Sequence, residues 1–87
     1  MTRNVVVVDP AVEKVLDGLR DRKLNARLWE AIEALSDNPR PPRVKKMVGR
    51  EADWRIRVGD WRIIYRVDDG RLVVLVVAAG GRKEVYR

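Results

Sequence analysis

Three arginines stand close together in the second half of the chain, and their residue type suits chemistry at a phosphate group. The stretch from residue 53 to residue 65 is Asp-Trp-Arg-Ile-Arg-Val-Gly-Asp-Trp-Arg-Ile-Ile-Tyr, and its cations are Arg55, Arg57 and Arg62. A guanidinium group can hold phosphate oxygens through forked hydrogen bonds, and several together offset the charge that develops on phosphorus during transfer. Because an arginine keeps its proton at any ordinary pH, it is a poor general base.

The pattern of this stretch predicts a β-hairpin that gathers the arginines on one face. Apolar and basic residues alternate before Gly59-Asp60, a two-residue turn that needs positive φ at the glycine. The predicted register places an apolar set toward the core, pairing Val58 with Trp61, Ile56 with Ile63 and Trp54 with Tyr65. On the other face Arg57 lies opposite Arg62, and Arg55 lies opposite Ile64.

The opposed arginines favour an anion in front of that face. Like charges directly opposite one another destabilise a sheet by about 0.2 to 1 kcal/mol, so pairing alone gives no reason for Arg57 to face Arg62. A bound anion would remove the repulsion. The alternative is a basic surface that protects a sheet edge from aggregation.

The composition excludes several classes of protein. The 87 residues predict one domain spanning residues 1–87. With no cysteine and no histidine, the chain has no disulfide, no usual zinc or copper site and no imidazole, so we expect no metal and no cofactor. The longest apolar run, residues 72–79, is too short to span a bilayer, and the amino terminus lacks the features of a signal peptide, so we expect a cytoplasmic protein without a membrane partner.

The net charge of +6 comes from one half of the chain. Residues 1–42 carry seven basic and seven acidic side chains, whereas residues 43–87 carry twelve basic and six acidic ones. A basic excess confined to one half predicts a surface for a polyanion, first of all nucleic acid, although a solvated surface kept for solubility is the alternative. Beside the hairpin, the expected nonspecific phosphate contacts are Arg43, Lys45, Lys46 and Lys83.

The first half of the chain predicts a strand and two helices. Residues 4–8 form a β-branched run that is apolar on both sides and is therefore expected to be covered. Asp9-Pro10 suits a helix start, and an apolar stripe at helical spacing carries that helix to about Arg20. Residues 21–23 are the expected connection to a second helix that ends near Ser36, before the proline-rich residues 37–42.

The second half predicts an antiparallel meander. Residues 44–48 are a possible strand before the hairpin, and Asp69-Gly70 is a second turn that would pair Asp68 with Arg71 and Val67 with Leu72. That register sends Leu72, Val74 and Val76 to the core. It leaves an apolar patch beside the arginines, made of Ile64, Val73, Leu75 and Val77. The expected fold is a small α+β domain, with a strand, a two-helix hairpin and an antiparallel β-meander, and with the helices packed on one face of the sheet.

The hairpin, the apolar strand after it and the closing Gly-Gly-Arg-Lys-Glu-Val-Tyr-Arg resemble the RelE/ParE family of toxins from bacterial toxin–antitoxin pairs. For the RelE branch, the resemblance implies metal-free cleavage of messenger RNA in the ribosomal A site. It implies catalytic roles for Arg55, Arg57, Arg62, Arg82 and Tyr86. Relatives often have lysine at the first two positions and a histidine or another polar residue where Gly81 stands here. A ParE-like poison of DNA gyrase, or a toxin fold without RNase activity, therefore stays open as the alternative.

The resemblance also implies a protein partner. Toxins of this family are neutralised by a cognate antitoxin, and an apolar patch with a basic rim suits a small, acidic, amphipathic protein. We expect it on Ile64, Val73, Leu75 and Val77, where it would neutralise the arginines. For the RelE branch, the ribosome and messenger RNA are the further partners.

Overall fold

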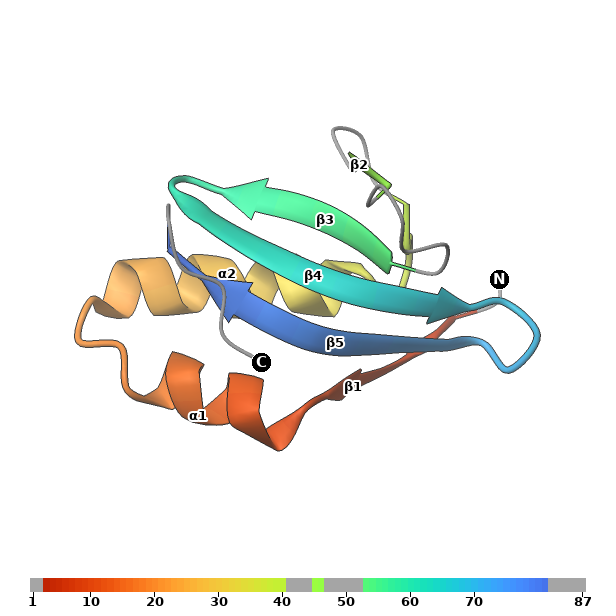
Figure 1. Ribbon diagram of the computed structural model, residues 1–87, viewed down its shortest axis with the longest axis horizontal. Coiled ribbons are helices and arrows are strands. Elements are labelled where there is room, and N and C mark those ends of the chain that lie inside the picture. The colour runs from red at the N-terminus through yellow and green to blue at the C-terminus, as the bar shows by residue number, and fades with distance from the viewer. Residues whose placement is uncertain (1–2, 41–44, 47–52, 82–87) are drawn as a thin grey trace.

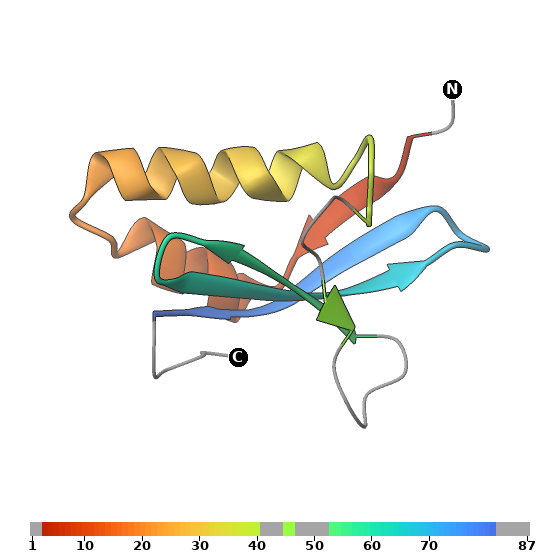
Figure 2. The ribbon, with the colours of Figure 1, turned by 90° about the horizontal axis from the view of Figure 1, so that it is seen from above.

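A computed structural model describes residues 3–40, 45–46 and 53–81, which form two helices and one mixed sheet (Figure 1). The elements in chain order are β1 (Val5–Val8), α1 (Pro10–Asp17), α2 (Arg22–Ala34), β2 (Lys45–Lys46), β3 (Asp53–Val58), β4 (Trp61–Asp68) and β5 (Val73–Gly80). The strands lie in the order β1-β5-β4-β3-β2. Both helices lie on the same side of the sheet (Figure 2), so the predicted α+β class and the one-sided packing are confirmed.

The hairpin of β3 and β4 has the predicted register at every pair. Arg57 lies opposite Arg62, Arg55 opposite Ile64, and Trp54 opposite Tyr65. Gly59 has a φ of 61°, whereas Asp60 does not have positive φ. Positive φ at the first central residue alone is the signature of a type II′ turn, which glycine adopts without steric cost.

The connection between β4 and β5 differs from the prediction. Asp68 pairs with Val73 and Val67 pairs with Val74, so the connection spans residues 69–72 and not the two residues Asp69-Gly70. The side chain of Asp68 accepts a hydrogen bond from the backbone N–H of Arg71 at 3.1 Å, which closes the longer turn. Because the register moves by two residues, Val74 and Val76 still face the core, but Leu72 leaves the strand and is 38% exposed.

A bulge in β5 changes which residues face the core near its end. Tyr65 pairs with Val76 and Ile64 pairs with Ala78, so Val77 is the extra residue between them. Ala79 consequently lies opposite Ile63 and joins the core. Sequence alternation alone would have placed Ala79 on the side of the arginines.

Strand β1 runs parallel to β5 at one edge of the sheet. Val5 pairs with Val73 and Val7 with Leu75. The expectation that β1 is covered on both sides is wrong, because Val5 is 62% exposed and Val7 is 45% exposed. The helices cover only the face that carries Val6 and Val8, which pack against the core.

Both helices begin at an aspartate cap. The Asp9 side chain accepts from the N–H of Ala11 at 2.9 Å, with Pro10 at the first helical position as predicted. Helix α1 ends at Asp17, before Gly18 and earlier than Arg20. Asp21 is not part of a connection to residue 23 but caps α2, because its side chain accepts from the N–H of Leu24 at 3.0 Å.

The core lies between the helices and the sheet. Its buried side chains come from the two helices, the turn after α2 and three strands: Val12, Leu16, Leu28, Ile32, Leu35, Ile56, Ile63, Tyr65, Val74, Val76 and Ala79. The three tryptophans, at positions 29, 54 and 61, are partly buried against this cluster. They therefore serve packing, as the sequence predicts.

Leu72 has a backbone conformation that is unfavourable for its residue type. Its φ is 56°, a left-handed conformation that costs a residue with a Cβ about 1 to 2 kcal/mol. We expect Leu72→Gly to be more stable than Leu72→Ala by about 1 kcal/mol, because both variants remove the side chain and only glycine relieves the strain. Chemical denaturation of the two variants measures the difference. Equal midpoints would contradict it.

Candidate functional site

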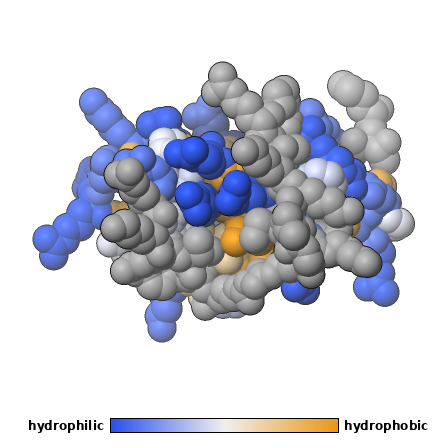
Figure 3. All heavy atoms as spheres, turned by 45° about the horizontal axis from the view of Figure 1, so that its top comes forward, coloured by the Kyte–Doolittle hydropathy of each residue, from blue (hydrophilic) through white to orange (hydrophobic). Residues whose placement is uncertain are grey.

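Arg55, Arg57 and Arg62 lie together on the side of the sheet opposite the helices, which we call the arginine face. Arg55 and Arg57 come from β3, and Arg62 comes from β4. The side chain of Arg57 is exposed, whereas those of Arg55 and Arg62 are half-buried. The structure thus brings together the three hairpin arginines that the sequence predicts. Figure 3 shows hydrophilic side chains next to a smaller hydrophobic area near the middle of the molecule.

The three hairpin arginines have no carboxylate partner among the described residues. Four other arginines form ion pairs, at nitrogen–oxygen distances of 3.0, 2.8, 2.7 and 3.8 Å: Arg3 with Asp37, Arg40 with Asp69, Arg66 with Asp53, and Arg71 with Asp68. The guanidinium groups of the hairpin are therefore available for an external anion.

The same face carries a compensated pair at its other end. Asp53 lies directly opposite Arg66, and its carboxylate accepts from Nε of Arg66 at 2.7 Å. The Asp53 side chain is 3% exposed, so its charge is buried and stabilised by that hydrogen bond. This pair was not predicted, although the predicted register gives it when it is extended by one residue beyond Trp54 and Tyr65.

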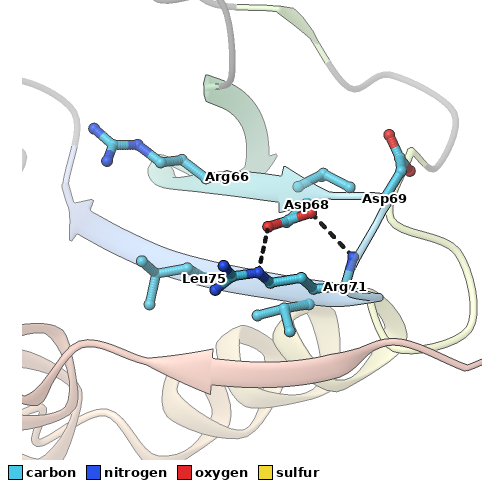
Figure 4. A pocket seen from close by; sticks show the side chains of 7 residues that line it. Arg66, Asp68, Asp69, Arg71 and Leu75 are labelled. Carbon is cyan, nitrogen blue, oxygen red and sulfur yellow. Dashed lines mark hydrogen bonds and ion pairs between the residues drawn. The ribbon is translucent and has the colours of Figure 1, made fainter.

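A hollow of about 470 Å³ lies beyond Arg66, where β4 passes into β5 (Figure 4). Its apolar lining includes Val73 and Leu75, and Arg66, Asp68 and Arg71 contribute charged side chains. On the neighbouring strand, the exposed Val5 and Val7 lie opposite these two apolar residues. An apolar surface with a charged rim thus extends from the hollow to the edge of the sheet.

Three of the four residues of the predicted apolar patch are partly accessible to solvent. Val73, Leu75 and Val77 are half-buried, but Ile64 is only 5% exposed. The available apolar surface therefore lies toward β1, where Val5 and Val7 extend it beyond the predicted patch. The signal was present in the four consecutive valines, but it required knowing that β1 pairs with β5.

Several predicted site residues lie outside the described part of the chain: Arg43, Arg82, Lys83 and Tyr86. Lys45 and Lys46 form β2, in which Lys45 pairs with Arg55 and Lys46 pairs with Trp54. The described residues contain no group of three potential metal-ligating side chains. No helix within residues 3–40, 45–46 and 53–81 is long and apolar enough to cross a membrane.

Comparison with known protein families gives one match over most of the chain. Residues 6–86 match the ParE toxin of the type II toxin–antitoxin system, parDE. The chain belongs to the ParE toxin family. No curated protein sequence matches this toxin.

Solved structures extend the likeness to RelE toxins. The toxin is 28% identical to a chain in the crystal structure of the archaeal RelE–RelB complex from Pyrococcus horikoshii OT3, with a TM-score of 0.82 over 97% of this chain and 99% of that one. It is 25% identical to a chain of the toxin–antitoxin complex RelBE2 from Mycobacterium tuberculosis, with a TM-score of 0.76 over 97% of both chains.

The isolated E. coli RelE toxin is 20% identical to this chain, with a TM-score of 0.79 over 93% of this chain and 86% of that one. At this identity the likeness concerns the fold alone. The protein is thus a toxin of a toxin–antitoxin system with the RelE fold.

In this toxin, the segment that leaves α2 is fastened to the sheet by a cluster around Arg40. Arg40 donates two hydrogen bonds to Asp69, at 3.1 and 2.8 Å, and its guanidinium lies 5.1 Å from the centroid of the Trp54 ring. The hydrogen bonds to Asp69 raise the pKa of Arg40, and the same bonds lower the pKa of Asp69. The hydroxyl of Tyr65 donates to the carbonyl of Pro39 at 2.7 Å.

Tyr65 is unsuited to proton transfer. Burial raises the pKa of Tyr65 to about 12 from its ordinary value of 10.0, against a smaller lowering by Arg40. Its ring belongs to the core, on the side of the sheet away from the arginine face. Arg55, Arg57 and Arg62 therefore supply positive charge, and Tyr65 adds no group on their side of the sheet that could transfer a proton.

The raised pKa predicts how stability depends on pH. Well below pH 10 the phenol is protonated in both the folded and unfolded states, so we expect the unfolding free energy of the wild type to exceed that of Tyr65→Phe by about 1 kcal/mol through the hydrogen bond to Pro39. As pH rises from 10 to about 12, the unfolded state releases the proton first, and this advantage shrinks. Urea denaturation of both proteins at several pH values tests this. A constant difference up to pH 12 would contradict it.

Proposed function

We propose that this toxin is a ribosome-dependent endoribonuclease that cleaves messenger RNA in the A site. The observation that carries the proposal is a cluster of three arginines that have no carboxylate partner within the described residues, on one face of a RelE-like sheet. The placement of Arg57 opposite Arg62 destabilises the hairpin of the free protein, and a phosphodiester would supply the missing negative charge. Because the proposed target is messenger RNA on the ribosome, we expect the toxin to act in the cytoplasm.

In the proposed reaction, the ribose 2′-oxygen attacks the adjacent phosphorus in line. The new 2′-O–P bond forms while the P–O5′ bond breaks, which leaves a cyclic phosphate and a free 5′-hydroxyl. Arg57 and Arg62 hold the nonbridging oxygens, and Arg55 supplies further positive charge. Positioning and electrostatic stabilisation then provide much of the rate.

Two proton transfers complete this proposed reaction. The 2′-hydroxyl must lose a proton, and the 5′-oxygen must gain one. Arginine is a poor base, so we assign these steps to Tyr86, which the family resemblance implies as catalytic, or to Lys83, the other titratable candidate, with Arg82 as an additional cation. Ribosomal groups are the other source of proton transfer.

Poisoning of DNA gyrase is the second candidate function, and the family match to the ParE toxin favours it. In that case the arginine face would bind a protein or DNA without cleaving RNA. Primer extension on translated messages after toxin induction distinguishes the two candidates. Cuts within codons identify the endoribonuclease, and intact messages with gyrase-dependent DNA breaks identify the poison.

Charge reversal on the arginine face should separate function from folding. We expect Arg57→Glu and Arg62→Glu each to abolish message cleavage and growth inhibition, because each places a carboxylate where the phosphate would bind. We also expect their melting temperatures to equal or exceed that of the wild type, because each reversal replaces a repulsive cross-strand pair by an attractive one.

Arg71→Glu is the matched control, since Arg71 is exposed and lies in the β4–β5 connection away from the hairpin arginines. It should retain toxicity. Cleavage by either hairpin variant at the wild-type rate would rule out the arginine face as the active surface.

We further propose that an acidic antitoxin binds the apolar side of the arginine face. The related solved structures include RelE–RelB and RelBE2 toxin–antitoxin complexes. On this chain, the exposed Val5 and Val7 and the half-buried Val73 and Leu75 offer apolar contact. Nearby arginines suit a partner that is acidic as well as amphipathic.

Binding of the antitoxin should protect a defined set of amides from hydrogen exchange. We expect protection in residues 62–77 and 82–86, and in β1 because of its exposed valines, when the toxin is mixed with the acidic protein encoded beside it. Mass spectrometry of the free and bound toxin measures the protection. If protection is confined to residues 10–36, the antitoxin binds the helices, and this docking site is wrong.

A further inference from the structure

A second hollow lies around the edge of the sheet from the arginine face, between α2 and the turn of the hairpin. It measures about 440 Å³ and is lined by Arg27, Glu30, Ala31, Ala34, Arg57, Val58 and Gly59. In the described part of the chain, β2 pairs with β3 only at Trp54 and Arg55, so the turn end of β3 has α2 and no strand beside it. This hollow is therefore open to a ligand that passes around the edge of β3.

Arg27 lies against the hairpin turn. Its Nη1 atom is 4.0 Å from the point where a Cβ on Gly59 would stand. The side chain is exposed and forms no ion pair with any described carboxylate, Glu30 included. Counting the described residues alone, the hollow holds one carboxylate and two guanidinium groups that form no ion pair, which leaves it with a net positive charge.

Arg57 connects this hollow to the arginine face. It lies opposite Arg62 in the hairpin and also lines the hollow. A strand of RNA whose phosphate is held between Arg57 and Arg62 could therefore continue past the turn, with its next phosphates directed toward α2. A protein that binds several successive phosphates of a nucleic acid does so with several cations placed along the strand. Next to Arg57 in this hollow, that cation is Arg27.

We propose that Arg27 binds an RNA backbone phosphate next to the one held on the arginine face, so that the RNA-binding surface extends onto α2. This inference rests on the proposed function. It makes Arg27 a positioning residue, which fixes the path of the strand and does not touch the reacting atoms. The ligand group is a phosphodiester, from either the message or ribosomal RNA.

The chemistry of the hollow favours a phosphate over the antitoxin. The exposed large hydrophobic residues of the described chain are Val5, Val7 and Leu72, and none of them lines this hollow. An amphipathic peptide would find no exposed large apolar anchor there, whereas a phosphodiester needs only the guanidinium groups. The sheet order also places β3 away from β1, where those valines lie.

The test compares Arg27→Gln with Arg22→Gln, which removes the same charge from an exposed position of α2 outside the hollow. Fluorescence anisotropy measures the binding of each protein to a 2′-O-methyl RNA 12-mer, which cannot be cleaved, over a range of salt concentrations. We expect Arg27→Gln to weaken binding about threefold to fivefold at 0.1 M salt and to reduce the salt slope by about 0.7. Arg22→Gln should change binding less than about twofold.

Glu30→Gln provides a result that a purely structural role for Arg27 would not give. Removing the carboxylate from the hollow should tighten RNA binding about twofold, because the repulsion between Glu30 and the phosphate is lost. Melting temperatures of all three variants should stay near that of the wild type, since the substituted side chains are exposed.

The same proteins are then bound to ribosomes programmed with the 2′-O-methylated message. Weaker binding of Arg27→Gln to the 12-mer identifies a message phosphate, and weaker binding only to ribosomes identifies a ribosomal RNA phosphate; both support the inference. Equal behaviour of Arg27→Gln and Arg22→Gln in both assays would overturn it, as would a loss confined to antitoxin binding. Because these assays measure binding without cleavage, failure of the proposed endoribonuclease activity would appear separately, in primer extension.

Discussion

The pairing of β3 with β4 sets the division of the sheet into a core face and an arginine face. Because side chains alternate along a strand, a slip of one residue would turn Arg55 and Arg57 toward the helices and turn Ile56 toward water. Gly59 fixes this register through its positive φ. Apart from its two chain neighbours, the only described atom within 4 Å of a Cβ placed on Gly59 would be Nη1 of Arg27. The requirement at Gly59 is therefore conformational more than steric.

Charge is distributed unevenly along the arginine face that this pairing creates. At the end away from the turn, Asp53 and Arg66 compensate one another across the strands. At the turn end, Arg57 and Arg62 occupy an equivalent cross-strand position with like charges. The same hairpin thus contains both arrangements, and the contrast shows that the fold can satisfy an arginine on this face where a carboxylate is present. Both proposed targets of the toxin would exploit the uncompensated end.

The sequence predicted the parts of the fold that depend on local chemistry. The Gly59-Asp60 turn gave the full register of one hairpin, and Asp9-Pro10 gave the start of α1. The second hairpin was mispredicted because Asp69-Gly70 resembles a two-residue turn, whereas the left-handed residue is Leu72, whose type gives no hint of positive φ. The bulge at Val77 was also missed, since a run of apolar residues contains no alternation from which a shift could be read.

In the candidate site, too, only the features that depend on local sequence were predicted. The three hairpin arginines were predicted because they lie within one local element. Arg27 was not, because only the packing of α2 beside the hairpin turn brings it to Arg57. The exposure of Val5 and Val7 likewise depends on a partner strand far along the chain. Contacts between distant segments carry no local signal in a single sequence.

The parallel pairing of β1 with β5 also constrains the order in which the toxin can be assembled during synthesis. Val5 cannot pair with Val73 until residue 73 has been synthesised, so β1 can join the sheet only after β5 has been made. Contacts this distant in sequence slow folding, because the entropy of closing a long loop is lost before the contact forms. The hairpin of β3 and β4, by contrast, can form from adjacent residues as soon as they emerge. The sheet of a newly made toxin is therefore completed only after most of its chain exists, which gives a partner made at the same time an interval in which to meet it.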